Sequence, residues 1–307
     1  MEKRKIKSIQ IHKSFLIPES AEEFRETEEF IEQITHYNKN GDIIETAKFV
    51  EDHELEIKII RVYDETNFLA EETHYHEDET EFTEKYIFKK NGSGKLNSIE
   101  KHYQDGSIEI TNFEYNEAGN LIKKIQFDED GNTEKTNEYI FDSSNQLIES
   151  KEMDESGIIH ENILLKYDSK NRLIEAEELD IANQTGIITL NSYNEKDEIS
   201  ESIIRDAKGK LLRKIINMYD ESGNIMKRNL ENYNEYHRID ITNYSYDHES
   251  RIVSEEVLGP FEEIRQKTNY EYNADGNLEI TYHYETENTQ NPGSHYWKTR
   301  MQYEFYD

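Results

Sequence analysis

Aromatic residues recur along the chain at nearly constant spacing, and polar turn-forming residues follow each of them. We call these aromatics the first anchors. They are about 26 residues apart, at Tyr37, Tyr63, Phe88, Tyr115, Phe141, Tyr167, Tyr193, Tyr219, Tyr246 and Tyr272. Six residues after most anchors stands Leu or Ile, and four residues after them stand Gly, Asn, Asp or Ser. Because these residues tolerate a left-handed backbone or form turns, each unit, such as YDESGNI at 219–225, predicts strand end, turn and strand start.

A second, weaker anchor lies about twelve residues after the first. It is occupied by Phe49, Tyr75, Tyr103, Phe127, Met153, Leu179, Leu258 and Tyr284. Turn sequences such as DEDGN at 128–132 often follow it. Each unit therefore predicts two antiparallel strands and two short turns, and ten units predict a meander of about twenty strands. A helix capped by Ser20 is the alternative near residues 20–34, where we favour a strand from about Glu29 onward.

The composition argues against a thick hydrophobic core. Only 34% of the 307 residues are hydrophobic, and the mean hydropathy is -1.00. We therefore expect an all-β, antiparallel repeat array that is curved or solenoid-like and thin or partly single-layered. The predicted divisions are an N-terminal cap segment at 1–28, the β-repeat array at 29–287 and C-terminal capping strands at 288–307.

The net charge is strongly negative. The chain has 67 acidic and 36 basic residues, which gives a formal charge of -31. Such a field repels nucleic acids and anionic membranes and attracts a basic protein; a simple role in solubility is the alternative. The chain has no cysteine, which excludes disulfides and thiolate chemistry. Without an apolar run of signal-peptide or membrane-spanning length, we expect a cytoplasmic protein, with export by a signal-independent route as the alternative.

The unit Y-D/N-x-x-G/N-x-L/I resembles the YD repeat of rearrangement-hotspot (RHS) and teneurin-type proteins. It matches well at 115–121, 167–173, 219–225 and 272–278, and the resemblance covers roughly 35–284. The alternating hairpins are also similar to the MORN-variant repeats of a family labelled as antitoxins. RHS proteins are longer and carry a core motif before a C-terminal toxin. This chain has neither feature, so the resemblance implies a stand-alone repeat protein and supplies no catalytic residue.

Candidate binding residues come from the strand centres and from the end of the chain. Glu149, Glu175 and Glu177 interrupt the apolar positions of their strands and are expected to attract a basic partner. Tyr296 and Trp297 form either a recognition patch or an aromatic cap on the last open edge.

Two motifs suggest a metal site but fit turns better. HYHEDE at 74–79 has two histidines and three acids, yet Tyr75 is a second anchor and the acids occupy a turn. DEDGN resembles the start of an EF-hand loop, but its twelfth position is Tyr139 instead of Glu. We therefore assign no metal or cofactor, and leave weak calcium binding by acidic turns open.

The sequence lacks the motifs of nucleophilic hydrolases and of nucleotide-binding enzymes, so we expect no enzyme activity. The favoured hypothesis is a protein-binding scaffold, most specifically an acidic inhibitor or immunity-type protein for a basic toxin or effector. One alternative is a structural or assembly component that self-associates through sheet edges or tyrosines. The other is carbohydrate binding, in which exposed tyrosines stack on sugar rings.

Overall fold

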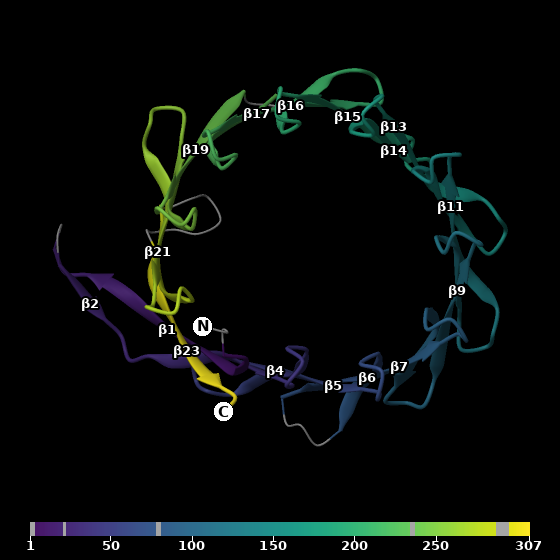
Figure 1. Ribbon diagram of the computed structural model, residues 1–307, viewed down its shortest axis with the longest axis horizontal. Coiled ribbons are helices and arrows are strands. Elements are labelled where there is room, and N and C mark those ends of the chain that lie inside the picture. The colour runs from purple at the N-terminus through teal and green to yellow at the C-terminus, as the bar shows by residue number, and fades with distance from the viewer. Residues whose placement is uncertain (1–3, 21–22, 78–80, 234–236, 287–294) are drawn as a thin grey trace. The chain divides into compact units, whose positions relative to one another are not determined.

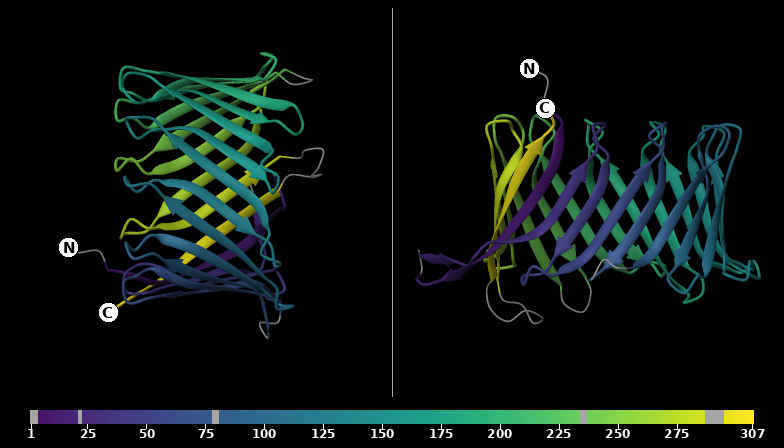
Figure 2. Two further views of the ribbon diagram at one scale, coloured as in Figure 1. Left: turned by 90° about the vertical axis from the view of Figure 1, so that its right-hand side faces the viewer. Right: turned by 90° about the horizontal axis from the view of Figure 1, so that it is seen from below.

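The computed structural model describes residues 4–20, 23–77, 81–233, 237–286 and 295–307. These residues form β-strands and turns, with no helix among them. The strands belong to one sheet of 23 strands, and neighbours in sequence pair antiparallel with short turns between them (Figure 2). The prediction of an all-β antiparallel fold is therefore confirmed. The chain divides into two compact units, unit 1 (Met1–Tyr86 and Thr242–Asp307) and unit 2 (Ile87–Ile241).

Unit 1 contains both ends of the chain. Its strands are β1 (Ile6–Pro18), β2 (Phe24–Glu26), β3 (Phe30–Tyr37), β4 (Ile43–Phe49), β5 (Leu55–Tyr63), β6 (Leu69–His76), β20 (Ile252–Leu258), β21 (Ile264–Tyr272), β22 (Leu278–Glu285) and β23 (His295–Phe305). Where a helix was the alternative, near residues 20–34, the chain forms β2 and β3, and Ser20 Oγ accepts a hydrogen bond from the Glu23 backbone N–H at 3.1 Å.

Unit 2 consists of consecutive hairpins. Its strands are β8 (Leu96–Tyr103), β9 (Ile108–Tyr115), β10 (Leu121–Phe127), β11 (Thr133–Phe141), β12 (Leu147–Asp154), β13 (Ile159–Tyr167), β14 (Leu173–Asp180), β15 (Thr185–Tyr193), β16 (Ile199–Asp206), β17 (Leu211–Tyr219) and β18 (Ile225–Asn232). The strands β7 (Phe82–Lys90) and β19 (Arg238–Tyr246) contain the unit boundaries.

The turn after each first anchor is built by the motif itself. In YDESGNI, the Asp220 backbone N–H donates to the Asn224 carbonyl at 2.9 Å. Asp220 Oδ1 accepts from the N–H groups of Ser222 and Asn224 at 2.8 and 2.9 Å. Gly223 has a φ of 90°, a left-handed conformation that glycine adopts without steric cost. The acidic side chain thus satisfies backbone donors that the reversal of the chain leaves unpaired.

The anchor tyrosines join successive repeats through their hydroxyl groups. Six of them donate to the backbone carbonyl of the Leu or Ile that starts a strand in the preceding repeat, at 2.7–3.0 Å. The pairs are Tyr63–Ile43, Tyr115–Leu96, Tyr167–Leu147, Tyr193–Leu173, Tyr219–Ile199 and Tyr272–Ile252. We call this series the tyrosine ladder. It explains why tyrosine and an aliphatic residue recur together: the two positions form one contact between repeats.

The sheet has few fully buried apolar side chains. Among the described residues only Phe30 and Ala47 are buried hydrophobics, at 8% and 6% exposed. Most other apolar residues are half-buried. The sheet therefore depends on backbone pairing, the tyrosine ladder and cross-strand side-chain contacts more than an ordinary globular domain does.

The expected curved, solenoid-like array of about twenty strands is wrong. β1 pairs with β3 on one side and with β23 on the other, the latter from Ile6 opposite Phe305 to Phe15 opposite Trp297. The first and last strands lie side by side (Figure 1). The 23-stranded sheet therefore closes on itself, where an open array would leave two unpaired terminal edges. Because β1 precedes the first anchor, the repeat contains no signal for its pairing.

β2 lies outside this closing arrangement. Among the described strands it pairs only with the end of β1, from Leu16 opposite Glu26 to Pro18 opposite Phe24. In Figure 2 this hairpin extends past the neighbouring strands of unit 1. The boundary predicted between residues 287 and 288 lies outside the described residues. The division of the chain into three parts stays a prediction.

Candidate functional site

The predicted acidic residues share one face of unit 2. Glu149 lies opposite Leu164, and Leu164 lies opposite Glu177, so the two glutamates occupy one row across β12, β13 and β14. With strands about 4.8 Å apart, they are separated by roughly 10 Å. Glu175 lies two residues before Glu177 on the same strand and therefore on the same face. The structure thus brings the three residues together.

Lysines neutralise much of this acidic group. Lys151 Nζ lies 3.1 Å from Glu149 Oε1, and Asn162 donates to the same oxygen at 3.2 Å. Lys166 Nζ lies 2.7 Å from Glu175 Oε1, and this hydrogen bond raises the pKa of Lys166. The three acids and two lysines leave a local charge of about -1. The strand centres therefore contribute less negative potential than the sequence suggested.

Exposed acids concentrate at the turns, which the sequence analysis considered only for weak calcium binding. We call the side of unit 2 with the turns after first anchors the first-anchor edge, and the opposite side the second-anchor edge. Exposed turn acids are Glu117, Glu195, Asp197 and Glu221 on the first, and Asp105, Glu129, Asp130 and Glu155 on the second. Acids two residues after an anchor were visible in the repeat, so the signal was available in the sequence.

Basic side chains connect neighbouring turns on the first-anchor edge. On the first-anchor edge, Lys170 Nζ binds Asp197 Oδ1 at 2.8 Å, and Lys196 Nζ donates to the Glu221 carbonyl at 2.8 Å. These contacts tie each turn to the next. From 126 to 161, in β10–β13 and the turns between them, every exposed charged residue is acidic, whereas Lys208 and Lys210 are exposed further along the second-anchor edge.

Tyr296 and Trp297 belong to β23 and pack against neighbouring side chains. Trp297 stacks on His283 with ring centroids 4.8 Å apart. Tyr296 contacts Tyr284 and Phe24 at centroid distances of 4.7 and 4.8 Å. Both residues are half-buried. β23 pairs with β22 and with β1, so their strand has partners on both sides, and their role in recognition stays a prediction.

The two metal-like motifs differ in how fully they are described. DEDGN at 128–132 forms a turn in which Asp128 Oδ1 accepts from the Asn132 backbone N–H at 2.7 Å. In HYHEDE, His74 Nε2 lies 2.7 Å from Glu72 Oε1, whereas Asp78 and Glu79 lie outside the described residues. Across the described part of the chain, no group of three or more potential ligands is placed to hold a metal ion.

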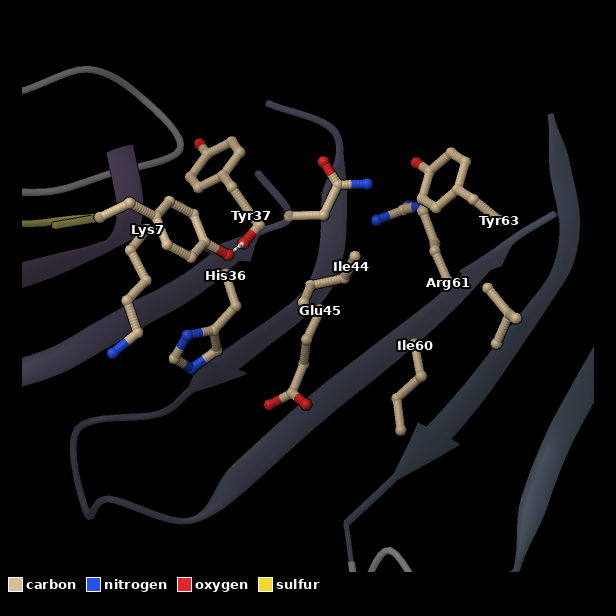
Figure 3. Close-up of a pocket in the computed structure, with 11 residues that line it drawn as sticks. Lys7, His36, Tyr37, Ile44, Glu45, Ile60, Arg61 and Tyr63 are labelled. Carbon is tan, nitrogen blue, oxygen red and sulfur yellow. Dashed lines mark hydrogen bonds between the residues drawn. The ribbon is translucent and has the colours of Figure 1, made fainter. Parts of the chain in front are cut away.

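A hollow of about 520 Å³ lies in unit 1 along β3, β4 and β5. Figure 3 shows that His36, Glu45 and Ile60 extend to one side of the sheet, whereas Tyr37, Arg61 and Tyr63 extend to the other. Ile60 and Arg61 are neighbours in one strand, which places them on opposite faces. In a small-molecule site the polar groups converge on one point. The polar groups around this hollow do not.

A smaller hollow of about 290 Å³ lies in unit 2 beside β11, β12 and β13. Its polar side chains are bonded to one another: Gln126 to Glu134 at 2.9 Å, Lys135 to Glu152 at 2.6 Å, and His160 to Asp154 at 2.8 Å. The His160 hydrogen bond holds the pKa of Asp154 below its ordinary value. This hollow therefore offers few unsatisfied groups to a ligand.

No model of a protein family matches the chain, and no curated protein does. Solved structures do match. The Tc holotoxin pore of Photorhabdus luminescens is 14% identical with a TM-score of 0.48, over 87% of this chain and 16% of that chain. The TcdB2–TccC3 crystal structure is 15% identical with a TM-score of 0.47, over 86% and 17%. A porin-like protein from Bacteroides uniformis is 10% identical with a TM-score of 0.33, over 97% and 98%.

The structural neighbours thus include Tc toxin components at low sequence identity, and this chain spans only about a sixth of their length. A search for membrane-crossing helices in the described residues found none of sufficient length and hydropathy.

Proposed function

We propose that this protein is a non-enzymatic repeat scaffold that binds a basic protein, most specifically as a cytoplasmic inhibitor of the immunity type for a basic toxin or effector. The observation that supports the proposal is the surplus of 67 acidic over 36 basic residues. A net charge of -31 attracts a basic surface over distances beyond direct contact and raises its association rate. The YD-type repeat would then serve to display this charge on an extended sheet.

The placement of the acids supports the same proposal. On the strand faces, lysines form ion pairs with acids on neighbouring strands, as in Lys135–Glu152 at 2.6 Å and Lys214–Glu201 at 2.7 Å. Exposed acids at the turns, such as Glu117, Glu129 and Glu155, remain accessible. A basic partner can approach these turn carboxylates without separating the ion pairs of the strand faces.

The first experiment uses the purified protein as bait in its own cell lysate, with washes at low salt and at ~0.5 M salt, since salt screens exposed charges. A stoichiometric basic protein that is retained at low salt and released at high salt is the expected result. Its association rate with the purified protein should then fall steeply as salt rises. Retention that is independent of salt, or a partner that is not basic, would contradict the proposal.

A matched set of variants tests the charged face of β12–β14. The triple change Glu149→Gln, Glu175→Gln and Glu177→Gln should slow association with that partner severalfold at low salt. The control change Lys151→Gln with Lys166→Gln removes the neutralising lysines and should speed it. A triple variant that associates at the wild-type rate would exclude this face. The assembly and carbohydrate hypotheses stay predictions, tested by light scattering and by a glycan array.

A further inference from the structure

The second-anchor edge of unit 2 combines exposed isoleucines with exposed acids. Ile158, Ile181 and Ile187 are 61%, 44% and 42% exposed. They lie on two neighbouring turns and the strand that follows them. The Ile181 backbone N–H donates to the His160 carbonyl at 2.8 Å. Ile181 therefore lies beside the first residues of β13, and Ile158 immediately precedes that strand. Exposed aliphatic residues grouped in this way are typical of a protein-binding surface.

We propose that this edge, from about residue 126 to residue 187, is where the basic partner docks, and that the partner presents apolar side chains between its basic ones. This inference rests on the proposed function and adds the location of the interface and the chemistry of the surface that fits it.

Charge complementarity identifies the occupant. From 126 to 187 the exposed acids are Glu129, Asp130, Glu134, Glu155, Glu161 and Glu178, and the exposed lysines of this range, Lys166 and Lys170, lie at the first-anchor end of β13 and in the turn after Tyr167. A second copy of this chain would bring two surfaces of the same sign together, and like charges at an interface suppress association. A partner with Lys or Arg around an apolar centre matches both the isoleucines and the surrounding carboxylates.

The dimensions also suit a protein surface. The turns at 128–132, 154–158 and 180–185 lie on the same edge, each two strands from the next. At about 4.8 Å per strand they extend over roughly 20 Å, which is the width of a modest protein–protein contact. The central turn presents Glu155 and Ile158 together, so an apolar anchor residue of the partner would lie next to a carboxylate.

The experiment compares two synthetic probes of equal positive charge. One is a lysine-rich peptide with a pair of leucines one helical turn apart, and the other has serines in place of those leucines. Binding of each to the full chain is measured by fluorescence anisotropy at low salt and at ~0.5 M salt. We expect the leucine peptide to bind at least about tenfold more tightly, because it buries apolar surface against the isoleucines.

The decisive variant is Ile158→Asn with Ile181→Asn, which should abolish the advantage of leucine over serine. The control is Met218→Asn with Met226→Asn, since these two residues are similarly exposed, at 52% and 47%, but lie at the first-anchor edge. The control should keep the advantage. Both isoleucines are exposed, so the substitutions leave the fold intact, which circular dichroism checks.

The outcomes separate the two proposals. Failure of both peptides to bind at low salt would overturn the proposed function together with this inference. Salt-sensitive binding of both peptides with no benefit from leucine, or a benefit that survives in the isoleucine variant, would overturn the location alone. Self-association of the chain through this edge, seen by light scattering and lost in the isoleucine variant, would also overturn it.

Discussion

Removal of a single hydroxyl from the tyrosine ladder tests whether the ladder stabilises the sheet. Tyr167 donates to the Leu147 carbonyl at 2.9 Å, and Phe at this position keeps the ring and loses only that hydrogen bond. A neutral intramolecular hydrogen bond contributes about 1 kcal/mol net. We therefore expect Tyr167→Phe to lower the free energy of unfolding by about 1 kcal/mol.

Tyr219 provides a graded comparison. Its hydroxyl donates to the Ile199 carbonyl at 2.8 Å, but Asn217 Nδ2 donates to the same oxygen at 2.9 Å. After Tyr219→Phe that carbonyl keeps one side-chain partner, so the cost should be smaller, about 0.5 kcal/mol. Tyr167 and Tyr219 lie four strands apart, roughly 19 Å, and the double variant should cost the sum, about 1.5 kcal/mol.

Urea unfolding followed by circular dichroism measures these differences. The dependence of the unfolding free energy on urea should keep the wild-type slope, because neither change alters the surface exposed on unfolding. An effect of Tyr167→Phe below about 0.3 kcal/mol would refute the stabilising role of the ladder. A larger cost at Tyr219 than at Tyr167 would refute the reasoning about the shared carbonyl.

Three further predictions follow from the turns and from the closing strands. Gly131 has a φ of 80° with no atom within 4 Å of an added Cβ, so Gly131→Ala should cost about 1 kcal/mol through backbone strain alone, measured by urea unfolding. Asp220→Ala removes the acceptor of two backbone N–H groups and should cost about 1 kcal/mol and speed amide hydrogen exchange in that turn; unchanged exchange would contradict this. Burial, aided by Arg300, lowers the pKa of His12, and burial, aided by Lys13, lowers that of His283, both from an unfolded value of 6.5. The unfolded chain therefore binds these protons first, and stability should fall as the pH drops below 6.5 towards the folded pKa values. The unfolding free energies at about pH 7.5 and about pH 5.5 should differ less in His12→Gln with His283→Gln than in wild type.

The local structure could be predicted because short segments encode it. An anchor, an Asp or Asn and a left-handed residue define each turn, and residues such as Asn171 and Asp197, with φ of 65°, adopt the expected conformation. The exception is informative. In the unit with the NGSGK insertion, the left-handed residue is Gly94 with φ of 82°, two positions after the expected Gly92.

Closure of the sheet could not be predicted in the same way. It depends on twist and curl accumulated over many strands, and on β1, which has no anchor turn. The charge of the strand centres was misjudged for a different reason. Lys151 follows Glu149 on the same face and was visible in the sequence, but the contact of Lys166 with Glu175 depends on the register of two strands. Register determines which charges neutralise each other.

The pairing of β1 with β23 has a consequence for how the chain is made. Ile6 and Phe305 are partners, so β1 must wait for the last strand to be synthesised before its second edge is paired. Until then an exposed strand edge is open to wrong partners. Once folded, the Tyr306 N–H donates to the Lys5 carbonyl at 2.9 Å, so a short linker could join these ends. A circular permutant that is opened at any hairpin turn would then retain every strand pair, and one that starts at a central turn would make β1 and β23 one after the other.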